Sequence, residues 1–94
     1  MTYRPKPIKT DHVAVPKEIL ALIEPLAEHA HDIWAQRRIE EGWQFGSSKN
    51  PERQETPLLV PYGELPESEK DLDREAALQT IKALLALGCS MTRG

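Results

Sequence analysis

Apolar residues recur at helical spacing in two parts of the chain, and extended or polar segments surround them. The first part covers about residues 16–41 and the second about residues 65–88. A proline-containing arm at 1–15 comes before them, and a polar loop at 46–57 without periodicity separates them. This pattern predicts a mainly α protein in which any strands are short and few.

The first helical part has recognisable start and stop residues. Pro16 suits a first helical turn, and Gly42 suits the position after the last one. Because Pro25 removes a backbone hydrogen bond, we expect a bend near Glu24, or a restart of the helix with Pro25 in its first turn. One arc of this helix carries the residues expected to pack inward: Leu26, Ala27, Ala30, Ile33 and Trp34.

The second helical part is apolar on two sides. The residues of the two sides are Leu72, Ala76, Ala83 and Leu87 on one, and Ala77, Leu78, Ile81, Leu84 and Leu85 on the other. A helix with this pattern is typically covered on both sides. We therefore expect a central helix that packs against residues 26–41 on one side, and against the arm, the loop or a partner subunit on the other.

Two short apolar runs are candidates for a minor sheet. Val13 alternates with Val15, and Leu58–Val60 is ended by a proline, so these two segments could pair as short strands. Shifting the chain by 45 residues also superposes its two Val-Pro pairs, 15–16 on 60–61. This overlap is a weak indication of two similar halves.

Length and charge narrow the possible functions. Ninety-four residues fit a single domain, 1–94, and 12 Lys and Arg against 15 Asp and Glu leave a net charge of −3, which disfavours binding of a nucleic-acid polymer. The single cysteine, Cys89, cannot form an internal disulfide, and we interpret it as a small core residue. Since no segment resembles a signal peptide or a membrane span, we expect a cytoplasmic protein without a membrane partner.

The residues do not favour an enzyme. His31-Asp32 is a pair that a metal-dependent hydrolase could use, but only His12 and His29 could join it as further histidine ligands, and His29 lies on another face of the helix. We therefore expect no metal site, although a hydrolase built on His31-Asp32 remains a third hypothesis. No nucleophile elbow, glycine-rich phosphate loop or Walker sequence is present in the 94 residues.

The strongest candidate for binding chemistry is an aromatic and basic segment. Three of the five aromatic residues fall within residues 34–45. Trp34 and Arg38 are four residues apart, so a helix places them on one face, where an indole can stack on a flat ring and a guanidinium can hold a phosphate or carboxylate. Arg37 and His31 could reinforce such a site. On spacing alone a structural role is the favoured interpretation, with Trp34 as a core anchor and Arg38 as its cation–π neighbour or an ion-pair partner.

The order of these residues resembles a known family. The first half contains Tyr3-x-Pro5-x-Pro7-Ile8, Val15-Pro16, Leu26-Ala27-Glu28-x-x-His31-Asp32-x-Trp34-Ala35-x-x-Arg38-Ile39 and Gly42-Trp43-x-Phe45-Gly46. The second half contains Leu59-Val60-Pro61-Tyr62-x-x-Leu65-Pro66-Glu67-x-Glu69-Lys70-x-x-Asp73-Arg74 and Thr80-x-Lys82-x-Leu84-Leu85-Ala86-Leu87-Gly88. Across residues 3–89 this order resembles the ryanodine receptor repeat domain, or RyR domain.

The resemblance implies a compact, mainly helical fold with minor strands and approximate internal two-fold symmetry. Such domains occur in tandem in calcium-release channels and as small single-domain proteins in bacteria and phages. The resemblance also implies a non-enzymatic module, with the tryptophan and arginine of the Trp-Ala-x-x-Arg motif, here Trp34 and Arg38, beside an adenine nucleotide. Because the channel repeats are paired, a single repeat would form an equivalent cleft by self-association, so we expect a homodimer.

Two functional hypotheses follow. The first is a ligand-binding or regulatory module without a cofactor, whose ligand is an adenine nucleotide or a nucleotide second messenger held by Trp34, Arg38, Arg37 and His31. The second is a protein–protein adaptor without a small-molecule ligand, which would use the arm and the 46–57 loop as contact segments.

Overall fold

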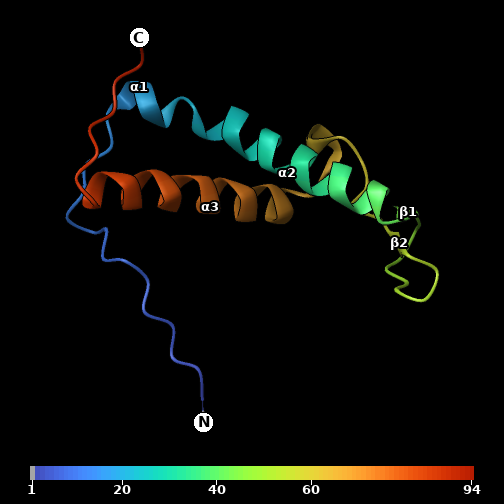
Figure 1. The fold of residues 1–94 in the computed structure, drawn as a ribbon. Coiled ribbons are helices and arrows are strands. Elements are labelled where there is room, and N and C mark those ends of the chain that lie inside the picture. Colours follow the sequence, from blue (N-terminus) through green and yellow to red (C-terminus); the bar gives the residue numbers. More distant parts are fainter. Residues whose placement is uncertain (1) are drawn as a thin grey trace.

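The computed structural model describes residues 2–94, and its main feature is a pair of long helices that lie side by side and run in opposite directions (Figure 1). The elements in chain order are α1 (Lys17–Leu20), α2 (Ile23–Glu40), β1 (Gln44–Phe45), β2 (Glu55–Thr56), the 3-10 helix η1 (Tyr62–Glu64) and α3 (Glu67–Ala86). The expectation of a mainly α fold with minor strands is confirmed.

The first helical part is divided into α1 and α2. The division lies at Ala21 and Leu22 and not at Glu24, so the expected position of the bend is wrong by two to three residues. Pro25 is the third residue of α2. It is tolerated there because the first backbone N–H groups of a helix have no partner inside the helix. The expected restart with Pro25 in the first turn is therefore what the structure shows.

The core is small and lies between α2, η1 and α3. Ala27 is completely buried, and Tyr62 and Leu65 pack with it, while Leu58 and Val60 cover the cluster from the preceding segment. This arrangement corrects the expected inward arc of α2. His31 is 5% exposed, whereas Ile33 is 52% exposed. The buried line of α2 is thus centred on Ala27 and His31, which are four residues apart.

Helix α3 packs against α2 on one side. Among residues 2–94, nothing covers its opposite side fully, so the expected cover on both sides is not seen. Ile81 is buried, whereas Leu72 and Leu87 are 66% and 68% exposed. The arm is linked to the helix by a hydrogen bond that the Thr10 hydroxyl donates to the side chain of Gln79. Cys89, expected in the core, is exposed. It lies just after Gly88, where the chain leaves the helix with a φ of 101°.

The expected strand pair was wrong. Residues 13–15 and 58–60 form no strand, and the two-stranded sheet pairs β1 with β2 in parallel instead, Gln44 with Glu55 and Phe45 with Thr56. Gly46 makes this approach possible, because a Cβ on it would lie 2.6 Å from the Glu55 Cβ. The polar loop is therefore folded back onto the end of α2.

The end of α2 is fixed by two residues with positive φ. Gly42, at 98°, ends the helix as expected, and Gln54, at 53°, follows a turn in the loop. The Gln54 side-chain amide donates to the carbonyl oxygen of Glu41 over 3.1 Å. This bond satisfies one of the carbonyl groups that a helix end leaves without a partner, and it ties the loop to the helix.

A cluster of charged residues joins α2, η1 and α3, and we call it the Arg74 clamp. The Arg74 guanidinium donates to both carboxylate oxygens of Glu24 and also to Glu67 and Asp71, with contacts of 2.8–3.2 Å. The Tyr62 hydroxyl donates to the same Glu24 carboxylate. Burial and this hydrogen bond raise the pKa of Tyr62 to about 12.

The N-terminal arm is extended and points away from the helices (Figure 1). Each half of the chain also places a short helix before a long one, α1 before α2 and η1 before α3. The approximate two-fold symmetry itself stays a prediction. None of the helices formed by residues 2–94 combines the length and apolar character that crossing a bilayer requires.

Candidate functional site

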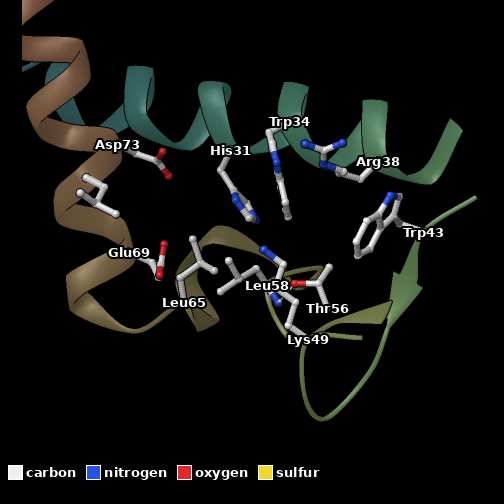
Figure 2. Close-up of a pocket in the computed structure, with 11 residues that line it drawn as sticks. His31, Trp34, Arg38, Trp43, Lys49, Thr56, Leu58, Leu65, Glu69 and Asp73 are labelled. Carbon is white, nitrogen blue, oxygen red and sulfur yellow. Dashed lines mark hydrogen bonds between the residues drawn. The ribbon is translucent and has the colours of Figure 1, made fainter. Parts of the chain in front are cut away.

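A pocket of about 410 Å³ opens at the end of α2, between this helix, the folded loop and the start of α3. Its lining residues are His31, Trp34, Arg38, Trp43, Lys49, Thr56, Leu58, Leu65, Glu69, Leu72 and Asp73. Figure 2 shows that His31, Trp34 and Arg38 project from α2 into the pocket, with Trp43 at one end and the carboxylates of Glu69 and Asp73 at the other. Its volume falls in the range of small-molecule sites.

One wall of the pocket is aromatic. The rings of His31 and Trp34 are stacked, with centroids 5.6 Å apart and an angle of 27° between their planes. Their spacing of three residues on α2 places them on one face, and Trp34 remains half-buried. The indole is therefore supported on one side by His31.

Arg38 lies near two tryptophan rings. Its Cζ atom is 5.9 Å from the Trp34 ring centroid and 5.8 Å from that of Trp43. Both distances are within the range of cation–π attraction. The guanidinium also donates to the Glu41 carboxylate over 2.7 Å. An anionic ligand at Arg38 would thus have to compete with Glu41.

His31 is held in place by the segment before η1. Its Nε2 atom donates a hydrogen bond of 2.7 Å to the carbonyl oxygen of Val60, since a carbonyl can only accept. The Tyr62 ring lies on another side, with centroids 6.3 Å apart. His31 is therefore fixed on three sides, which explains how a polar residue is buried in the centre of α2.

The folded loop supplies the cationic side chain opposite Arg38. Lys49 reaches the pocket from the loop between β1 and β2, and the buried Thr56 lies beside it (Figure 2). The Thr56 hydroxyl accepts a hydrogen bond from the Leu58 backbone N–H over 3.2 Å. The strand pair thus positions the floor of the pocket.

The structure brings three of the four predicted site residues together. Trp34, Arg38 and His31 all line the pocket, whereas Arg37 is exposed and does not line it. Neighbouring positions on a helix point about 100° apart, which accounts for the exposure of Arg37. Contact of Arg37 with the same ligand as Arg38 stays a prediction.

Sequence reasoning missed several lining residues. Neither Trp43 nor Lys49, which belongs to the polar 46–57 loop, was singled out from the sequence as a ligand contact, yet both line the pocket. Their only signal in the sequence was the concentration of aromatic and basic residues around Gly42. Asp73 also lines the pocket, together with Glu69, whereas the neighbouring Arg74 binds Glu24.

The lining of the pocket shows whether a second copy of the chain is required to form it. Trp34 and Trp43 both come from one chain, so a second copy is not required to place two indoles at the cavity. Within residues 2–94, no three His, Cys, Asp or Glu side chains gather so that they could hold a metal ion.

Comparison with known families agrees with the order of the motifs. A family model described as the RyR domain matches residues 3–93, nearly the whole chain. Membership of this family indicates a regulatory or ligand-binding module in general terms. With the pocket at the Trp-Ala-x-x-Arg motif and a match of this length, the chain belongs to the RyR domain family.

Proposed function

We propose that this RyR domain is a non-catalytic binding module for a nucleotide or a nucleotide-derived signal. The observation that carries the proposal is the arrangement of Trp34, Arg38 and Trp43 around one pocket. A flat base can stack on an indole, and Arg38 and Lys49 can hold the phosphate. The pocket thus offers the two contacts that a nucleotide needs.

The magnitudes favour weak binding. Stacking of a base on an aromatic side chain contributes about 1–3 kcal/mol, and a hydrogen bond to a charged group contributes about 1.5–3 kcal/mol. Together the two contacts supply about 2.5–6 kcal/mol, whereas a millimolar Kd requires about 4 kcal/mol after the cost of association is subtracted. These two contacts alone therefore support weak binding, in the millimolar range at best.

Calorimetric titration with AMP, ATP, ADP-ribose and cyclic di-AMP tests the proposal. We expect wild type to bind at least one of these ligands, and Trp34→Ala or Arg38→Ala to weaken that binding about tenfold to a hundredfold. Calorimetry is preferred because removal of Trp34 would itself alter the fluorescence.

Arg37→Ala is the matched control, since Arg37 is the neighbouring arginine on the same helix and lies outside the pocket. It should bind like wild type. Absence of binding by wild type, or equal losses in Arg37→Ala and Arg38→Ala, would contradict the proposal.

A protein–protein adaptor is the second candidate function, and the exposed arm favours it. Tyr3 is 83% exposed and Ile8 is 49% exposed. The two prolines at positions 5 and 7 keep the segment from Tyr3 to Ile8 extended. If the arm is the binding segment, removal of residues 2–9 should abolish partner capture in cross-linking experiments without changing nucleotide binding. The expected bacterial or phage origin would be consistent with either function.

A further inference from the structure

The pocket carries opposite charges at its two ends. Arg38 lies beside Trp43 at one end, Lys49 enters from the folded loop between the two ends, and Glu69 and Asp73 project from α3 at the other end (Figure 2). Glu69 and Asp73 are four residues apart, so one face of α3 presents both carboxylates. A ligand that spans the pocket meets the Arg38 guanidinium at one end, Lys49 in the middle and two carboxylate acceptors at the other end.

The two carboxylates in the pocket differ from the other acidic residues of α3. Glu67 and Asp71 accept from Arg74, and Glu75 accepts from Gln79. Among residues 2–94, neither Glu69 nor Asp73 has a hydrogen-bond or ion-pair partner, although both are half-buried. Their acceptor oxygens therefore remain available to a group inside the cavity.

This lining selects among nucleotides. Ionised carboxylates accept hydrogen bonds from hydroxyl and amino groups, which a ribonucleoside supplies. They also repel additional phosphate groups, and Arg38 already shares its charge with Glu41. The two cations of the pocket are balanced by two carboxylates, so the site suits one phosphate better than three.

We infer that Glu69 and Asp73 are specificity-determining residues that make the pocket a site for a nucleoside monophosphate, with its phosphate at Arg38 and Lys49 and its hydroxyl or amino donors at the carboxylates. This inference rests on the proposed nucleotide-binding function. The inference specifies that the ligand carries one phosphate group, and that Glu69 and Asp73 bind the nucleoside end of the ligand.

The test compares AMP with ATP in wild type and in the double variant Glu69→Gln/Asp73→Asn, which keeps the side-chain shapes and removes their charges. We expect wild type to bind AMP several times more tightly than ATP. In the double variant AMP binding should weaken about tenfold, and the preference for AMP should disappear because the repulsion of the extra phosphates is gone.

Glu75→Gln is the matched control, since Glu75 is on the same helix and outside the pocket. Thermal unfolding checks that each variant is folded. If wild type binds AMP but the double variant keeps the same affinity and the same AMP-to-ATP ratio, this inference is wrong and the proposed function stands. If wild type binds no nucleotide, the proposed function fails together with the inference.

Discussion

His31 lies behind the Trp34 indole in the wall of the candidate site. Its ring is buried, its Nε2 atom donates to the Val60 carbonyl, and its face stacks on Trp34. The hydrogen bond fixes the orientation of the His31 ring, and because the Trp34 indole stacks on this ring, its orientation is restricted as well. We therefore interpret His31 as a positioning residue for Trp34.

The substitution His31→Phe tests this role at the level of one atom. The phenylalanine side chain retains an aromatic ring but cannot donate to Val60, so a partly buried carbonyl loses its partner. We expect the free energy of unfolding to fall by about 1–3 kcal/mol, measured by urea denaturation. The exposed His29 lies on the same helix, so His29→Phe is the control and should change stability little. Equal effects of the two substitutions would contradict the role of the hydrogen bond.

Only part of the site could be predicted from the sequence. Trp34 and Arg38 were predictable because their spacing of four residues is sufficient to place them on one helical face. Lys49 and Glu69 were not, since their approach depends on a loop and a second helix that fold against α2. Arg37 was grouped with Arg38 from sequence, but it does not line the pocket, because neighbouring helical residues point in different directions.

At the scale of elements, the Arg74 clamp connects parts that are distant in the chain. Glu24 belongs to α2, Tyr62 to η1 and Arg74 to α3. The hydrogen bonds from Arg74 hold the pKa of Glu24 and of Glu67 below their usual value of 4.5. Both carboxylates are solvent-exposed, so the effect is expected to depend on salt.

The clamp predicts a loss of stability in acid. Because the folded-state pKa values of Glu24 and Glu67 are lowered, their contribution is present above the unfolded value of 4.5 and disappears as the pH falls through the folded values. We expect the urea midpoint of wild type to drop below about pH 4.5 more than that of Arg74→Met. Lys82→Met is the control on the same helix and should follow wild type. Parallel pH curves for wild type and Arg74→Met would exclude the clamp as the cause.

The elements themselves were predictable to different degrees. The long helices follow from apolar periodicity, which extends over several turns in each. The strands contain two residues each, and a two-residue segment has no measurable alternation. Their pairing depends instead on the close approach of Gly46 to Glu55, a contact between residues in different segments. The position of the helix break was misjudged because Pro25 ends a helix only in its interior, not in its first turn.

At the scale of the whole molecule, the buried core is thin for a protein of 94 residues. The buried hydrophobic residues among those described are Ile19, Ala27, Tyr62, Leu65 and Ile81. A second, apolar groove of about 670 Å³ lies between α2 and α3, and Leu26 and Leu84 on its walls are each 40% exposed. A small domain gains much of its stability from any further apolar surface that it can cover.

We therefore predict that two copies associate through this groove. Leu84→Glu should place a charge in it and yield monomers in sedimentation velocity at micromolar concentrations at which wild type is dimeric. Ile39→Glu is the control, because Ile39 is 62% exposed and lies outside the groove. Since one chain supplies the whole lining of the proposed nucleotide pocket, monomeric Leu84→Glu should still bind one nucleotide per chain if the proposal holds. A monomeric wild type would refute the dimer, whereas loss of nucleotide binding on dissociation would show that the second copy completes the site.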